Sequence, residues 1–183
     1  MLRILIEGRD ASLYHCTTLD NAMLILNSGV IQGSNYSHKG GVSLTRNKNY
    51  LVNDESEVQF ELDQRKLSQT KKIEPYAYFS RKKGTKNYES EEVVIGDVSL
   101  KKFVTRVDIH PEVLEFYTDT YNLARDSYEE RGYVSIHDTA VFSSDQIEVL
   151  EFLLEVIRLK LPFGKSLTTA SKGIMKIISN VKN

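Results

Sequence analysis

Three short segments of the chain carry polar or reactive side chains directly beside apolar ones. They are 14–18 with His15, 41–46 with Ser43, and 89–95 with Glu92. A neutral imidazole can hydrogen-bond a ligand hydroxyl, and a carboxylate can stabilise positive charge that develops in a transition state. Taken singly, each segment also fits a structural role, as a hydrogen-bonded histidine, a solvent-facing serine or a solvated acidic edge. Together they predict one cleft on which His15, Ser43, Tyr50 and Glu92 converge.

Each segment lies at the edge or end of a predicted strand. Residues 12–16 predict a strand that leads into a helix with Thr18 as its N-cap and Gly29 as its stop. Alternation of apolar and polar residues predicts further strands at 41–45, 58–63 and 103–109, and the apolar run at 92–95, which Gly96 ends, predicts a buried strand. The stretch 64–86 shows little periodicity and predicts a loop, held by apolar anchors such as Tyr76 and Phe79.

Beyond Pro111 the pattern changes to helices. Residues 112–129 and 145–161 predict two helices, the second capped by Ser143 or Ser144, and 166–181 predict a third, basic one. The second helix has a predicted apolar face of Ile147, Leu150, Leu154, Ile157 and Leu161. We therefore predict an α+β fold, in which residues 1–110 form a domain of antiparallel strands around a cleft and residues 111–183 form a helical C-terminal extension.

The length of 183 residues allows a compact core, and the composition restricts the class of protein. No apolar run approaches the roughly 18 residues that span a bilayer, and the first residues lack a signal-peptide pattern. We therefore expect a cytoplasmic protein with no membrane contact. Cys16 is the single cysteine, which excludes an internal disulfide, and the four histidines have no zinc-site spacing, so we predict no metal.

The charges are grouped into blocks along the chain. Residues 64–86 hold eight lysines or arginines, from Arg65 to Lys86, and one acid, Glu74, whereas 108–155 hold twelve acids and two arginines. A block of this kind predicts contact with phosphates or with an acidic protein, and a solvated loop is the alternative. We predict a protein or nucleic-acid partner at Arg65 to Lys86.

In their order and context, the three segments resemble the motifs of the ADP-ribosyltransferase superfamily, over roughly residues 12–110. In that family, a strand carrying His and Thr leads into a helix that ends Ala-x-x-Ile-Leu-x-x-Gly, which matches 14–17 and 22–29. A Gly-hydrophobic-Ser strand, followed by a polar segment that ends in an aromatic residue, matches 41–50. A glutamate just before a Val-Leu-Ile-like strand matches 92–95.

The resemblance implies two small antiparallel sheets around a cleft that holds NAD as substrate, without a metal ion. It implies that Glu92 is the catalytic residue, aimed at the ribose 2'-hydroxyl. It further implies that the residues that contact NAD or shape its site are His15, Thr17, Ser43, Thr45, Arg46 and Tyr50. Among these, His15 would hydrogen-bond ribose hydroxyls and Tyr50 would stack on the nicotinamide ring.

The function that the resemblance implies is NAD-dependent transfer of ADP-ribose to a protein or nucleic acid, in the manner of a phage or bacterial toxin or counter-defence protein. The alternative is a catalytically silent member of the same fold that binds a partner or nucleotide, such as an antagonist of another ADP-ribosylating system. An RNA 2'-phosphotransferase ranks last, because it needs several arginines and Arg46 alone is well placed. Ser90, two before Glu92, disfavours modification of arginine, and Glu91 or Glu89 replaces Glu92 if the strand register differs.

Overall fold

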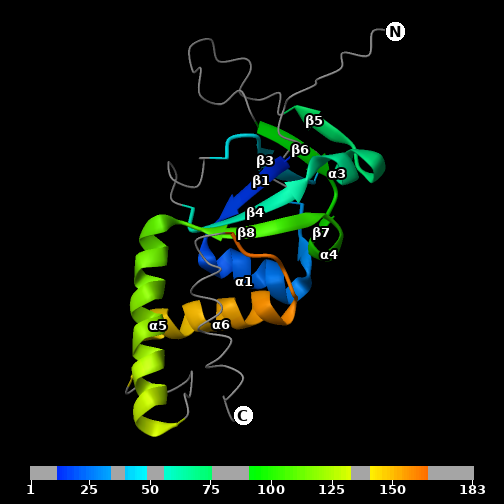
Figure 1. Ribbon diagram of the computed structural model, residues 1–183. Coiled ribbons are helices and arrows are strands. Elements are labelled where there is room, and N and C mark those ends of the chain that lie inside the picture. The colour runs from blue at the N-terminus through cyan, green and yellow to red at the C-terminus, as the bar shows by residue number, and fades with distance from the viewer. Residues whose placement is uncertain (1–11, 34–39, 49–55, 76–90, 133–140, 165–183) are drawn as a thin grey trace, which may run out of the picture.

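The computed structural model describes residues 12–33, 40–48, 56–75, 91–132 and 141–164, and the account below concerns these residues (Figure 1). The strands are β1 (Ser12–Thr17), β2 (Val30–Ile31), β3 (Gly41–Thr45), β4 (Val58–Asp63), β5 (Ile73–Pro75), β6 (Glu91–Ile95), β7 (Val98–Ser99) and β8 (Val104–Ile109). The helices are α1 (Leu19–Ser28), α3 (Gln64–Thr70), α4 (Leu100–Phe103), α5 (Pro111–Arg131) and α6 (Ser144–Arg158).

Six of these strands form one antiparallel sheet in the order β5-β6-β3-β1-β4-β8. Strands β2 and β7 pair separately as a two-stranded antiparallel sheet. The prediction of an α+β fold built on antiparallel strands is therefore confirmed. The order also places β1, β3 and β6, which carry the three polar segments, side by side.

Helix α1 begins and ends where the sequence predicts. The hydroxyl of Thr18 accepts a hydrogen bond from the backbone N–H of Asn21, at 3.4 Å, and so caps the first turn. Gly29 has a φ of 70°, in the left-handed region that glycine adopts without strain, and its N–H donates to the carbonyl of Leu26. These two residues fix the helix directly after β1, against one face of the sheet.

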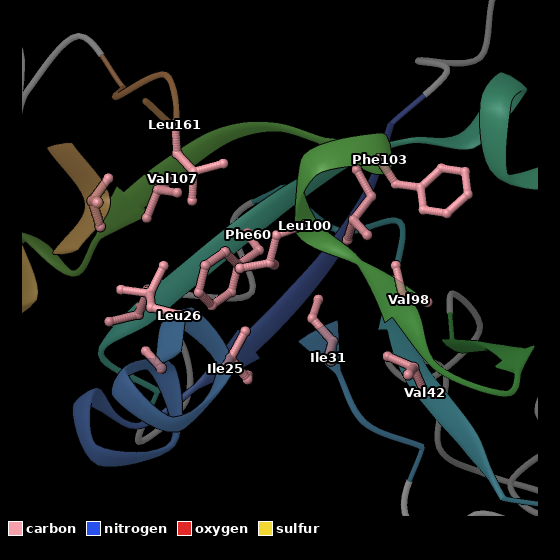
Figure 2. Close-up of a cluster of buried hydrophobic side chains, with 14 of the residues drawn as sticks. Ile25, Leu26, Ile31, Val42, Phe60, Val98, Leu100, Phe103, Val107 and Leu161 are labelled. Atoms are coloured by element: carbon pink, nitrogen blue, oxygen red, sulfur yellow. The ribbon is translucent and has the colours of Figure 1, made fainter. Parts of the chain in front are cut away.

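The hydrophobic core lies between that face and helices α1 and α6, which Figure 1 shows beneath the sheet. Phe60 from β4, Leu26 from α1 and Phe152 from α6 are each 0% exposed and belong to one cluster. Figure 2 shows Phe60 and Leu26 meeting Leu100, which enters the same cluster from α4. Helix α6 therefore shares a core with the sheet, while the proposed boundary between residues 110 and 111 stays a prediction.

The buried face of α6 differs from the predicted one. The side chains of the helix that are buried are Val149, Leu150, Phe152, Leu153 and Val156. Of the predicted face, Leu150 and Leu161 are buried, as expected. Leu154 and Ile157, which were also predicted, are only partly buried. The prediction was wrong because this helix is apolar on more than one side, so periodicity alone does not choose the face that packs against α1.

Helix α5 packs against α6 through a second, small cluster. Phe142 and Leu150 are its buried members, and Tyr128 from α5 lies against them. Figure 1 shows α5 running across the end of α6 at one side of the molecule. The two helices predicted at 112–129 and 145–161 are therefore present as α5 and α6, whereas the helix predicted at 166–181 lies outside the described residues.

The stretch 64–86 is not a loop throughout, contrary to the sequence prediction. Its described part forms α3 and β5, with the carboxylate of Asp63 accepting a hydrogen bond from Lys66 N–H at the start of α3. Leu67 is the one buried residue of this helix. A helix of seven residues with one buried side chain has almost no hydrophobic periodicity, which is why the pattern missed it.

Helices long and apolar enough to cross a lipid bilayer are absent from the described part of the chain.

Candidate functional site

The strand register places the side chains of His15 and Glu92 on the same face of the six-stranded sheet. Tyr14 pairs with Thr45, and Leu44, the residue before Thr45, pairs with Glu92. His15 follows Tyr14, so His15 and Glu92 share the face opposite to that of Tyr14 and Thr45. Glu92 is therefore the glutamate of β6 that lies in register with His15 across β3.

That shared face is the core-facing one, and one strand separates the two residues. Glu92 pairs with Leu44 in β3, and His15 pairs with Phe60 in β4. Because Tyr14 pairs with Thr45, His15 lies opposite Leu44 on the other side of β3. The row His15, Leu44, Glu92 thus places an imidazole and a carboxylate on either side of a buried leucine.

The imidazole of His15 is held by the backbone of the neighbouring strand. Its Nδ1 lies 3.1 Å from the carbonyl oxygen of Ser43. A carbonyl oxygen can only accept, so Nδ1 carries the proton and Nε2 presents a lone pair. Burial lowers the pKa of His15 below its usual value of 6.5, and the bond to Ser43 only partly opposes that shift. The neutral ring is therefore a hydrogen-bond acceptor near pH 7.

The carboxylate of Glu92 is held on one side only. The Nε and Nη2 atoms of Arg46 both contact its Oε1, at 2.6 and 2.5 Å. The side chains of Arg46 and Glu92 are 25% and 17% exposed, so the ion pair is largely shielded from water. The other oxygen, Oε2, is buried and has no hydrogen-bond partner among the described residues. A buried carboxylate oxygen without a donor is costly, and a ligand hydroxyl would satisfy it.

Sequence reasoning missed Gln64, which fixes the arginine of this pair. The Nη1 atom of Arg46 donates to Oε1 of Gln64 at 2.9 Å. Gln64 is the first residue of α3, directly after the Asp63 cap, so the helix that the sequence did not predict positions this contact. A capping aspartate followed by a short helix is the signal that could have drawn attention to it.

Gly41 allows β3 to pack closely on β6. A Cβ atom added to Gly41 would lie 2.3 Å from Cγ1 of Val93 and 2.8 Å from the carbonyl oxygen of Val94. Only a glycine fits at this contact without a shift of one strand. The glycine that opens the 41–46 segment therefore has a packing role.

The other predicted site residues do not all lie on the face of the sheet that carries His15 and Glu92. Thr17 lies two positions after His15 in β1 and so shares its face. Ser43 pairs with Val93, and its side chain is exposed on the face opposite to Glu92. Thr45 also points away from Glu92, is buried, and accepts a hydrogen bond from the Asn47 N–H. Ser43 contacts the site through its backbone carbonyl rather than its hydroxyl.

Tyr50 lies outside the described residues, and so do Glu89 and Ser90. Within 64–75, part of the basic charge is balanced locally, because Lys66 pairs with Asp63 and Lys72 pairs with Glu74. The residues from 76 to 86 also lie outside the description. The predicted partner at Arg65 to Lys86 therefore stays a prediction.

The described residues contain no group of three or more His, Cys, Asp or Glu side chains that could hold a metal ion. The arrangement offers instead a neutral imidazole acceptor, a carboxylate with one unengaged oxygen, and a guanidinium beside it. Compared with known proteins, the chain matches no family model and no curated protein.

Proposed function

We propose that this chain is an NAD-dependent ADP-ribosyltransferase-like protein that acts on a protein or nucleic-acid target, with the α+β fold serving as the two-sheet scaffold of that superfamily. The supporting observation is the placement of His15 and Glu92 on one face of the sheet, with strand β3 between them, and with Oε2 of Glu92 buried and without a hydrogen-bond partner among the described residues. The resemblance of residues 12–110 implies that these two residues face one ligand site.

The chemistry follows from the charge that the reaction develops. Cleaving the glycosidic bond between nicotinamide and ribose builds positive charge on the ribose, which a nearby carboxylate stabilises. Oε2 of Glu92 can accept a hydrogen bond from a ribose hydroxyl, while Arg46 keeps Oε1 in place. Nε2 of His15 can accept a hydrogen bond from a second ribose hydroxyl. No metal is needed for any of these contacts.

The test compares two neighbouring glutamates by nicotinamide release from NAD. Glu92→Gln keeps the shape of the side chain but removes its charge, so release should fall at least 100-fold while NAD binding is largely retained. Glu91→Gln is the matched control, because Glu91 pairs with Thr45 and is one position out of register with His15, so this substitution should leave release unchanged. His15→Ala should weaken NAD binding. Release that survives in Glu92→Gln, or is lost equally in Glu91→Gln, would contradict the assignment.

A catalytically silent binding protein is the second candidate, and the Arg46 contact favours it. Two N–H groups on Oε1 neutralise part of the charge that transition-state stabilisation needs. A silent member would bind NAD or a related nucleotide, in a manner sensitive to His15→Ala, without releasing nicotinamide. Nicotinamide release by the wild-type protein therefore separates the two candidate functions. If the wild type does not bind NAD, the residues around His15 and Glu92 are not an NAD site under either candidate.

A further inference from the structure

A second pocket lies where the C-terminal ends of α1 and α6 meet α4. Its volume is about 560 Å³, within the range of pockets that hold small ligands. Val104, the first residue of β8, lines it, and three strands separate β8 from β6 and Glu92 in the sheet order. The pocket is therefore separate from the candidate NAD site, and a ligand bound in it would not touch Glu92.

The walls of the pocket combine aliphatic side chains with cationic ones. Leu100 and Leu161, which Figure 2 shows entering the buried cluster from α4 and from the segment after α6, are buried at its base. The cations around it are Lys101, Arg158 and Lys160, all of them exposed. They come from segments that are more than 50 positions apart in the sequence. Such walls match a ligand that has an apolar body and a negative charge.

Two of these cations have no partner among the residues that the structure describes. Arg158 pairs with Glu155, but the described residues provide neither an ion pair nor a hydrogen bond for the ammonium groups of Lys101 and Lys160. The described lining of the pocket contains no acidic residue. The positive charge that faces the pocket is therefore available to a ligand.

Basic residues at helix C-termini often serve only to balance the negative end of the helix dipole. Here the terminal carbonyls are already engaged by backbone N–H groups. The carbonyl of Gly29 accepts from Leu100, and those of Ile157 and Val156 accept from Lys160 and Leu161, at 2.9 to 3.1 Å. Since the backbone satisfies these oxygens, the two lysine ammonium groups are not required as caps.

The backbone of Lys160 has a left-handed conformation. Its φ is 55°, and it is the one non-glycine residue with a positive φ among the described residues. This left-handed position after a helix is usually occupied by glycine, because a side chain makes it strained. The hydrogen bonds from Lys160 N–H to Ile157 and from Leu161 N–H to Val156 identify this position as the C′ residue of a Schellman motif that ends α6, and the motif fixes the lysine at the edge of the pocket.

We propose that this pocket binds an amphipathic anion, with its carboxylate or phosphate on Lys101 and Lys160 and its aliphatic body against Leu100, Val104 and Leu161. The described lining contains no aromatic ring on which a nucleobase could stack. The ligand is therefore an aliphatic carboxylate or an alkyl phosphate rather than a nucleotide.

The test titrates the full chain with octanoate, octyl phosphate and the uncharged octanol, and follows backbone amide NMR signals. The two anions should give saturable shifts near Lys101 and Lys160, and octanol should bind about 10-fold more weakly than the better anion. Tighter binding of octyl phosphate assigns the pocket to phosphates, and tighter binding of octanoate assigns it to carboxylates. Equal binding of octanol, or no saturable shift, would overturn the proposal.

Two variants and a matched control locate the site. Lys101→Ala should weaken binding of the anion about 3-fold to 10-fold. Lys102→Ala is the control, because Lys102 is the next residue of α4, is exposed, and does not line the pocket. Equal weakening by both substitutions would mean a non-specific charge effect and would contradict the proposal.

Lys160→Gly separates a binding role from a structural one. Removing the side chain relieves the left-handed strain, so the urea midpoint of unfolding should rise while anion affinity falls about 3-fold to 10-fold. A lysine that only stabilised the end of α6 would give the opposite change in the urea midpoint. Unchanged anion affinity in this variant would remove Lys160 from the site and overturn the proposal.

Discussion

At the scale of single residues, the protonation of His15 links stability to pH. Burial lowers its pKa in the folded state below the usual 6.5, so the unfolded chain binds the proton more tightly. The contribution of His15 to the free energy of unfolding is therefore complete above about pH 6.5 and decreases as pH falls toward the folded-state pKa. Below that pKa the contribution no longer changes.

Urea denaturation of the wild type and of His15→Gln, at about pH 7.5 and about pH 5.5, checks this expectation. The wild type should lose more free energy of unfolding between the two conditions than the variant does, because glutamine does not titrate. An equal pH dependence in both proteins would show that His15 is not the group responsible. NAD binding, if present, should weaken over the same interval, since protonation removes the acceptor at Nε2.

At the scale of elements, the start of α6 depends on one serine. The hydroxyl of Ser143 accepts from Gln146 N–H, and the Gln146 side chain accepts from Ser143 N–H, which is a complete capping box. Ser143→Ala should lower the free energy of unfolding by about 1 kcal/mol. Ser144→Ala is the matched control, because the partner of its hydroxyl among the described residues is the exposed Asp145. Chemical denaturation that ranks the two substitutions in the reverse order would contradict this assignment.

The helix ends and strands that sequence could predict are those specified by local chemistry. Thr18 and Gly29 bound α1 through hydrogen bonds to residues three or four positions away, so their spacing alone predicts it. Ser143 was one of two predicted caps for α6 for the same reason. By contrast, α3 contributes a single buried residue, Leu67, and the four-residue α4 follows a two-residue strand, so neither produces a pattern.

The candidate site could be predicted only in part, because its geometry depends on register. Sequence placed His15 and Glu92 at strand ends, but the choice between Glu92 and Glu91 required the pairing of Thr45 with Glu91. A shift of one residue would exchange the two faces. The contact of Gln64 with Arg46 joins the start of α3 to the end of β3, and no local pattern indicates such a contact.

At the scale of the whole molecule, α6 joins the sheet and α1 in one hydrophobic cluster, so these elements should unfold together. Phe152 is 0% exposed within that cluster. Its replacement by alanine removes a large side chain from a packed interior and leaves a cavity, which typically costs about 3–5 kcal/mol. Because the cluster includes Phe60 and Leu26, the loss should weaken the sheet and α1 as well as α6.

Phe152→Ala should therefore shift one cooperative transition, seen at the same urea concentration by far-ultraviolet circular dichroism and by tyrosine fluorescence. Leu154→Ala is the control on the same helix, since Leu154 is only partly buried and should cost clearly less. Two separate transitions in the variant would mean that α6 unfolds independently, as a separate helical extension does. A larger loss from Leu154→Ala would instead mean that α6 packs through the face predicted from periodicity, with Leu154 and Ile157 against α1.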